Sequence, residues 1–146
     1  MYLIKLLPEQ IAEHWEMLRY AISESLPPIA SETPEKMNNI LRHLLMGGLQ
    51  CWITSEKEIP EYIRAVVTTR FATDDITQTK TLLIYSLYSF APLSEADTDA
   101  MYKPLTRYAE ANGCNRIIAY AVDDNVVGIA EKYGMVPQYQ LLTLDL

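Results

Sequence analysis

The sequence predicts one α+β domain, residues 1–146, built around a central mixed β-sheet that is flanked by four helices. Three observations lead to this prediction. The chain has 146 residues, a usual size for one domain, and 49% of them are apolar, which is enough for a core. Apolar residues recur at helical spacing in some segments and fill short strand-like runs in others. Short turns separate the middle runs, and such turns favour antiparallel pairing.

The N-terminal segment predicts a strand and then a helix. Residues 2–7 are a short apolar strand, and Pro8 suits the first turn of a helix, where its missing N–H has no cost. The helix has one apolar face, formed by Ile11, Trp15, Leu18 and Ile22. Pro27 and Pro28 are expected to end it.

A second helix is marked at both ends. Thr33 is a capping hydroxyl, Pro34 fits the first helical position, and Gly47 with Gly48 is a typical helix end. Its apolar face is formed by Met37, Ile40, Leu41, Leu44 and Leu45. Three strands are then expected at residues 49–54, 62–72 and 79–90.

The last third predicts two crossover helices and two strands. Ser94 and Asp97 resemble a capping box, so a helix is expected from Ser94 to Asn112, with Met101, Leu105, Tyr108 and Ala109 facing inward. Pro104 removes a hydrogen bond, so either the helix is kinked or its regular part starts near Lys103.

The remaining elements follow as a strand, a short helix and a final strand. The strand covers residues 116–122, and Asp123, Asp124 and Asn125 cap the helix, which ends at Gly134. Residues 136–144 are expected to be the last strand. Crossover helices near the end of the chain fit a mixed sheet.

Charge and composition exclude several classes of function. The net charge of −7 argues against nucleic acid and against an anionic membrane surface, because both need clustered Lys and Arg. No apolar run approaches the roughly 20 residues of a spanning helix. Residues 1–8 are too short for a signal peptide, so a cytoplasmic protein is expected, with Cys51 and Cys114 reduced. His14, His43 and the cysteines are not grouped, so no metal site is expected.

The C-terminal third carries a family resemblance. Ala111-Asn112-Gly113-Cys114-Asn115-Arg116-Ile117, Asp124-Asn125 and Glu131-Lys132-Tyr133-Gly134-Met135-Val136-Pro137, together with the element order, resemble the GNAT superfamily of acyl-CoA N-acyltransferases. The resemblance implies transfer of an acyl group from a coenzyme A thioester to an amine. It also implies a cofactor cleft between the strands at residues 79–90 and 116–122.

The same resemblance implies where the cofactor would bind. Main-chain groups of the first cleft strand would pair with pantetheine, here at Leu87, Tyr88, Ser89 and Phe90, with Asn125 beyond the second strand. The family holds the pyrophosphate on a loop rich in glycine and preceded by a basic residue. This chain departs from that pattern, because residues 93–100 contain no glycine but do contain three acids, Glu95, Asp97 and Asp99. Each acid would repel a pyrophosphate by roughly 3 kcal/mol at close range, so binding of acetyl-CoA or CoA is doubtful.

The catalytic residues are less defined. Many family members place a tyrosine as general acid about five residues before the Gly-Phe phenylalanine, a position that is Ala130 here, and Tyr133 lies one turn later on a different face. Tyr88, Tyr120 and Asp123 remain as candidates, each with a packing or capping role as the alternative. Strand alternation predicts that Tyr85 and Tyr88 lie on opposite faces, with Ser86 on the side of Tyr88 and Ser89 on the side of Tyr85.

Three functions therefore compete. The first is an acetyl-CoA-dependent N-acetyltransferase with an atypical pyrophosphate loop and a small-molecule or peptide amine as acceptor. The second is a catalytically inactive GNAT-like domain for binding or assembly. The ten tyrosines are compatible with an interaction surface, including that of a homodimer. The third is an enzyme that uses another acyl donor in the same cleft.

Overall fold

The computed structural model describes residues 1–27, 33–121 and 123–146. The described elements are β1 (Tyr2–Lys5), α1 (Pro8–Glu13), α2 (Trp15–Glu24), α3 (Pro34–Met46), β2 (Gln50–Ser55), β3 (Ala65–Asp74), β4 (Thr79–Ser89), α4 (Glu95–Ala111), β5 (Arg116–Ala119) and α5 (Asp124–Lys132). The sequence-predicted helix end at Pro28 and strand end at Val122 fall outside the described residues.

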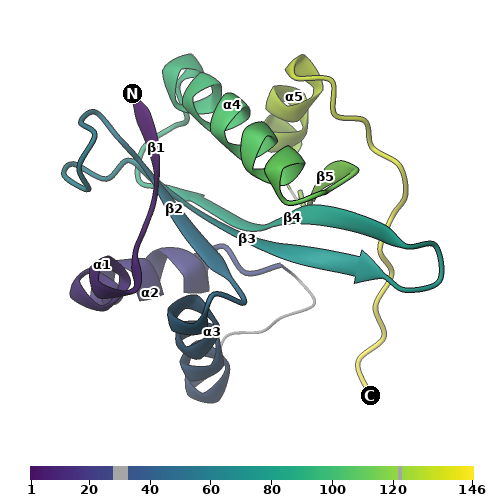
Figure 1. The fold of residues 1–146 in the computed structure, drawn as a ribbon, viewed down its shortest axis with the longest axis horizontal. Coiled ribbons are helices and arrows are strands. Elements are labelled where there is room, and N and C mark those ends of the chain that lie inside the picture. The colour runs from purple at the N-terminus through teal and green to yellow at the C-terminus, as the bar shows by residue number, and fades with distance from the viewer. Residues whose placement is uncertain (28–32, 122) are drawn as a thin grey trace.

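The strands form one five-stranded sheet in the order β1-β2-β3-β4-β5. Pairing is antiparallel from β1 to β4 and parallel between β4 and β5. Figure 1 shows α1, α2 and α3 on one side of the sheet and α4 and α5 on the other. The predicted mixed sheet is confirmed, and α4 is the crossover that a parallel pair requires.

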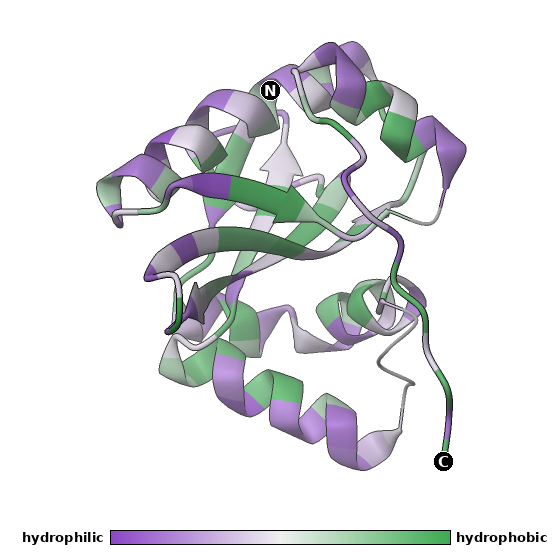
Figure 2. Cartoon of the chain, turned by 90° about the vertical axis from the view of Figure 1, so that its right-hand side faces the viewer, coloured by the Kyte–Doolittle hydropathy of each residue, from purple (hydrophilic) through white to green (hydrophobic). Residues whose placement is uncertain are grey.

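Each face of the sheet has its own apolar core. Alternate residues of β2 divide between them, with Cys51 and Ile53 under α1–α3 and Trp52 under α4. The indole Nε1 of Trp52 donates a hydrogen bond to Thr69 Oγ1 at 2.9 Å, so its polar atom is satisfied inside the core. Figure 2 shows the strands as a largely hydrophobic layer between helices with hydrophilic outer faces.

The first predicted helix is two helices. His14, with φ −102° and ψ 14°, ends α1 and precedes α2, so the expectation of one continuous helix is wrong. The apolar spacing still holds, because Ile11, Leu18 and Ile22 are buried in one cluster against which Trp15 packs. The break changes the direction of the helix without removing its inner face, and it gives five flanking helices among the described residues instead of four.

The second predicted helix is confirmed as α3 at both ends. Thr33 Oγ1 accepts a hydrogen bond from the N–H of Lys36 at 3.2 Å, and Gly47 has φ +88°, a conformation that glycine adopts without strain. Met37 and Leu44 are buried as expected. Leu45 is 41% exposed, so its assignment to the inner face is wrong.

A β-bulge changes the alternation of β4. Thr68 pairs with Ser86 and the next residue, Thr69, pairs with Ile84, so Tyr85 is an extra residue between two rungs. Tyr85 and Tyr88 consequently pack against the same cluster, under α1–α3. The prediction that they lie on opposite faces is wrong, because strict alternation fails across the inserted residue.

The long helix is continuous from Glu95 to Ala111, with Pro104 inside it. The alternative in which the regular part starts near Lys103 is therefore wrong. Met101, Leu105 and Ala109 are buried against the sheet, and this packing offsets the hydrogen bond that Pro104 removes.

The predicted last strand does not form. Residues 135–146 follow α5 without helix or strand, and no sheet pairing of β5 other than with β4 occurs among the described residues. Figure 2 shows this segment leaving α5 and passing the edge of the sheet. An alternating apolar pattern favours a strand, but a strand also needs a hydrogen-bonding partner, and this segment has none here.

Candidate functional site

The site is organised by the separation of β4 from β5, by which we mean that their pairing stops at Ile84 and Ala119, where β5 ends and β4 continues. Four residue pairs join the two strands, from Thr81 with Arg116 to Ile84 with Ala119. Beyond Ile84, β4 continues to Ser89 with β3 as its strand partner. The bulge at Tyr85 lies where the separation starts. One edge of the second half of β4 is therefore open.

The open edge presents main-chain groups of two residues. The N–H of Phe90 donates to Arg64 O at 2.9 Å, so the main-chain groups of Phe90 face the β3 side. Main-chain groups alternate between the two edges of an antiparallel strand. Those of Tyr88 therefore face β3 as well, whereas those of Leu87 and Ser89 face the opening. An extended ligand with amide groups can pair with these two residues in the manner of a strand.

Tyrosines gather on the α2 side of the opening. The Tyr88 ring lies edge-on to that of Tyr20 at 5.7 Å and to that of Phe90 at 5.0 Å. A hydrogen bond with Tyr20 raises the pKa of Tyr88. Burial raises the pKa of Tyr85. The positive charge of Arg70 lowers this pKa in part, and the neighbouring Tyr120 raises it. Each phenol therefore remains protonated at neutral pH and is a hydrogen-bond donor.

The N-terminus of α4 lies beyond the end of β4 and is closed by a capping box. Ser94 Oγ accepts from the N–H of Asp97 at 3.1 Å, and Asp97 Oδ2 accepts from the N–H of Ser94 at 2.9 Å. The predicted capping pair is confirmed. Glu95 and Ala96 occupy the first two helical positions, whose N–H groups have no partner within the helix. These two amides are the donors that α4 can offer to an anion.

Asp97 is turned away from solvent by an ion pair. Its side chain is 1% exposed, and its Oδ1 lies 3.1 Å from Arg64 Nε. Burial alone would raise the pKa of this carboxyl, but the hydrogen bonds from Arg64 and Ser94 outweigh burial and lower it. Its charge is thus neutralised locally, and Asp97 does not act as a free acid facing a ligand.

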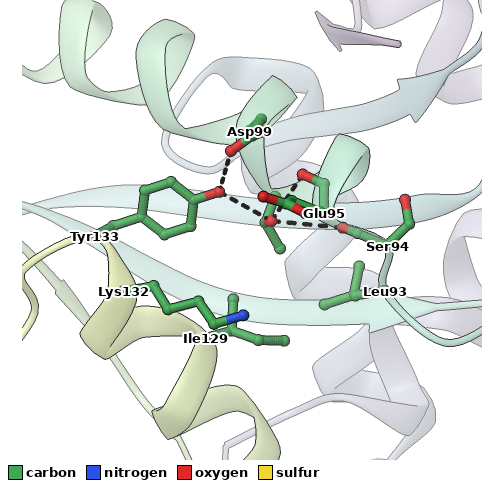
Figure 3. A pocket seen from close by; sticks show the side chains of 8 residues that line it. Leu93, Ser94, Glu95, Asp99, Ile129, Lys132 and Tyr133 are labelled. Atoms are coloured by element: carbon green, nitrogen blue, oxygen red, sulfur yellow. Dashed lines mark hydrogen bonds between the residues drawn. The ribbon is translucent and has the colours of Figure 1, made fainter.

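A cavity of about 250 Å³ lies between this end of α4 and α5. The cavity is lined by Leu93, Ser94, Glu95, Thr98, Asp99, Ile129, Lys132 and Tyr133. Figure 3 shows Lys132 extending beside Ile129 towards Leu93, and the Tyr133 hydroxyl directed at Asp99. Two carboxylates and one ammonium group therefore face the same space.

Tyr133 is held on α4 by three contacts. Its hydroxyl is hydrogen-bonded to the Asp99 carboxylate and lies 3.0 Å from Thr98 Oγ1. Its ring stacks on that of Tyr102 at 5.0 Å. The hydrogen bond to Asp99 raises the pKa of the phenol. The Asp99 charge is thereby partly satisfied. Among the described residues, the Glu95 carboxylate on the same wall has no side-chain partner.

The other predicted residues lie near the end of β5. Tyr120 directly follows the strand and is 38% exposed. Asp123 Oδ1 accepts from the N–H of Asn125 at 2.9 Å, so the Asp123 side chain caps α5. Their assignment to catalysis or cofactor binding remains a prediction.

Three features of the site were not predicted from the sequence. Arg64 is separated from Asp97 by 33 residues, and no local pattern connects them. The bulge at Tyr85 likewise has no sequence signal, because β4 has no glycine there. Lys132 belongs to the segment that carries the family resemblance, and its place beside Glu131 could have marked it as a candidate cation.

Other kinds of site are absent from the described part of the chain. No group of three or more His, Cys, Asp and Glu side chains that could hold a metal occurs in residues 1–27, 33–121 and 123–146. In those same segments, none of the helices combines the length and the hydropathy that a membrane span needs. Cys51 and Cys114 form no disulfide in the structure, and Cys51 is buried whereas Cys114 is half-buried.

Solved structures with the same architecture are numerous, although no family model and no curated protein matches the sequence. A structure described as a probable acetyltransferase aligns with TM-score 0.72 and 13% identity, covering 100% of this chain and 98% of the other. Ribosomal-protein-alanine N-acetyltransferase from Brucella melitensis biovar Abortus 2308 aligns with TM-score 0.70 and 11% identity, covering 100% of both chains.

A third structure contains a ligand. AAC(6')-Iy in complex with the bisubstrate analog CoA-S-monomethyl-acetylneamine aligns with TM-score 0.71 and 9% identity, covering 99% of this chain and 96% of the other. At such identities, the likeness concerns the fold. Together with the mixed sheet and the separation of β4 from β5, these alignments show that the chain has the GNAT acetyltransferase fold.

Proposed function

We propose that this protein is an acetyl-CoA-dependent N-acetyltransferase with an atypical pyrophosphate site. The observation that carries the proposal is the open edge of β4 beside the separated β5, which offers main-chain groups of Leu87 and Ser89 to an extended amide-containing ligand. A fold-level likeness to acetyltransferases supports the reaction class, and an analog of CoA is bound in one such structure.

Pantetheine fits the open edge of β4 because its two amides can pair with a strand as another strand would. Of the four predicted residues, Leu87 and Ser89 would make these main-chain contacts. Tyr88 and Phe90 would contribute their side chains on one face of the opening, where the two rings contact each other. When bound, the thioester supplies the acetyl group, which passes to the nitrogen of an amine with release of the CoA thiol.

The pyrophosphate would sit at the cavity beside α4. The main-chain N–H groups of Glu95 and Ala96 and the ammonium group of Lys132 would hold it. The side-chain carboxylates of Glu95 and Asp99 would repel it. Asp97 does not contribute to this opposition, because Arg64 neutralises it. The residues therefore fit an anion, with less affinity than a glycine-rich basic loop would give.

The acceptor we propose is a small-molecule amine that enters from the α2 side. Tyr20, Tyr85, Tyr88 and Tyr120 line that approach with rings and phenol donors, and Glu24 lies close enough to influence the pKa of Tyr88. A carboxylate beside aromatic rings suits a cationic amine. The free Cys51 and Cys114 agree with a cytoplasmic setting.

Calorimetric titration with acetyl-CoA and CoA tests the cofactor assignment. We expect saturable binding in the micromolar to submillimolar range. Lys132→Ala should weaken it about fivefold, the effect of one partly exposed charge. Lys103→Ala is the matched control, because Lys103 is an exposed lysine elsewhere on α4, and should leave the affinity unchanged.

The second candidate is the catalytically inactive GNAT-like domain. Two observations favour it, namely the acids Glu95 and Asp99 in the cavity wall and Ala130 at the position of the family's tyrosine. Absence of binding at millimolar acetyl-CoA would contradict the enzyme and support this alternative. Binding of CoA without acetyl transfer to any of a panel of primary amines would support a binding role as well.

A further inference from the structure

Tyr133 comes from the end of α5 and reaches across the cavity to α4. Its side chain is half-buried and lines the cavity, and Figure 3 shows its hydroxyl directed at Asp99. Its ring stacks on that of Tyr102, with an angle of 25° between the two planes. Stacking fixes the direction of the ring, and thereby the position of the hydroxyl over the first turns of α4.

The hydroxyl proton of Tyr133 is given to Asp99. A phenol donates a single hydrogen bond, and the two oxygens within its reach are Asp99 Oδ1 and Thr98 Oγ1. The carboxylate is the stronger acceptor because it is charged. Thr98 gives its own proton to the main-chain oxygen of Glu95 at 3.0 Å. In the part of the chain that the structure describes, Tyr133 is therefore the side chain that satisfies Asp99.

The direction of Asp99 matters because of its place on α4. Asp99 lies four residues after Glu95, so the two side chains share one face of the helix. Helix side chains lean towards the N-terminus, which would direct Asp99 to the turn whose N–H groups can hold a phosphate. The hydrogen bond holds the carboxylate on the phenol instead, and the positive end of the O–H dipole partly offsets its charge.

We propose that Tyr133 is a positioning residue for the pyrophosphate, which acts by holding the Asp99 carboxylate so that Glu95 is the acid that chiefly opposes the anion. This role rests on the proposed function, because it serves the pyrophosphate end of the same site. Lys132, the residue before Tyr133, lines the same cavity with its ammonium group. Two consecutive residues of α5 thus act together, one attracting the anion and the other restraining an acid.

Two ligands separate this role from a structural one. CoA carries the pyrophosphate, whereas pantetheine has the same amides without it. Tyr133→Phe should raise the dissociation constant of CoA about fivefold by calorimetry, because the released carboxylate repels the anion across partly exposed space. The dissociation constant of pantetheine, measured by ligand-observed NMR, should not change. In steady-state assays, the KM for acetyl-CoA should rise by the same factor at unchanged kcat.

A double-mutant cycle tests whether Tyr133 acts through Asp99. In the Asp99→Asn chain, Tyr133→Phe should alter CoA affinity less than twofold, because no charge is left to restrain. Asp99→Asn alone should strengthen CoA binding less than Glu95→Gln does. Tyr102→Phe is the matched control, since it keeps the stacked ring and removes a 47% exposed hydroxyl-bearing side chain's only polar group, and it should leave CoA affinity unchanged.

The opposite results are equally distinct. Equal weakening of CoA and pantetheine by Tyr133→Phe overturns the proposal and makes Tyr133 a structural link between α5 and α4. A loss of CoA affinity that persists in the Asp99→Asn chain overturns it as well. Binding of pantetheine without CoA binding in any variant overturns it but leaves the open edge of β4 as a pantetheine site. Binding of neither ligand at millimolar concentration overturns the proposed function, and this role with it.

Discussion

Arg64 and Asp97 form a two-point ion pair that joins the loop before β3 to the first turn of α4. Arg64 Nε lies 3.1 Å from Oδ1 of Asp97, and Nη2 lies 3.2 Å from Oδ2. The main-chain carbonyl of Arg64 also accepts from the N–H of Phe90. One arginine thus fixes both the end of β4 and the start of α4, the two elements between which a cofactor would be held.

Asp97→Asn should destabilise the fold. The substitution keeps an acceptor for the capping box but removes the charge that Arg64 and Ser94 stabilise, so we expect a loss on the order of 2 kcal/mol in the free energy of unfolding. Urea denaturation measures it. Glu110→Gln, an exposed acid on the same helix, is the control and should change stability little.

The same residue predicts an acid dependence. The folded pKa of Asp97 is lowered, so its stabilising contribution is present at neutral pH and is lost as the pH falls below about 4 and through the folded value. The unmodified chain should therefore lose stability over this range more steeply than Asp97→Asn. Parallel pH profiles would contradict the role of the ion pair.

Removal of the acids in the cavity wall should strengthen cofactor binding. Glu95→Ser with Asp99→Ser removes two negative charges from the cavity while Asp97 and its structural contacts stay in place. We expect about a tenfold lower dissociation constant for CoA by calorimetry, with an effect that shrinks in high salt. An unchanged constant would show that these acids do not limit binding.

Tyr133→Phe should leave acetyl transfer nearly unchanged. The phenol is hydrogen-bonded to Asp99 and Thr98, and its ring keeps the stack on Tyr102 after the substitution. We expect kcat within about twofold of the unmodified value and the same pH profile. A loss of about a hundredfold or more would instead assign Tyr133 as the general acid.

The two cysteines should differ in reactivity. Burial raises the pKa of Cys51 to about 12, so its thiolate is scarce at neutral pH, whereas Cys114 is half-buried. A colorimetric thiol reagent should therefore label one cysteine per chain in the native protein and both after denaturation. Rapid labelling of both in the native state would contradict the packing of β2.

Local signals predicted much of the fold. The caps at Thr33 and Ser94 and the glycine at Gly47 each depend on residues within one or two turns, and the structure confirms all three. Apolar spacing likewise predicted the buried face of α4. Such features are decided by neighbours in the chain, so the sequence displays them directly.

Features that depend on distant residues were predicted poorly or not at all. The extra residue at Tyr85 is defined by its register against β3, and no property of β4 alone indicates it. Asp97 was interpreted as a free repelling charge because its partner, Arg64, lies far away in the sequence. The final strand was predicted from its pattern, which is present, but its pairing depends on a partner that the pattern does not specify.

The short contact between β4 and β5 has a mechanical consequence. Four residue pairs hold β5 to the sheet, compared with ten between β3 and β4, and α5 contributes no fully buried side chain. Rotation of β5 and α5 about these four rungs would break fewer strand pairs than movement of β2, β3 or β4. On the β5 side, the opening can therefore change its width with little loss of strand pairing elsewhere in the sheet.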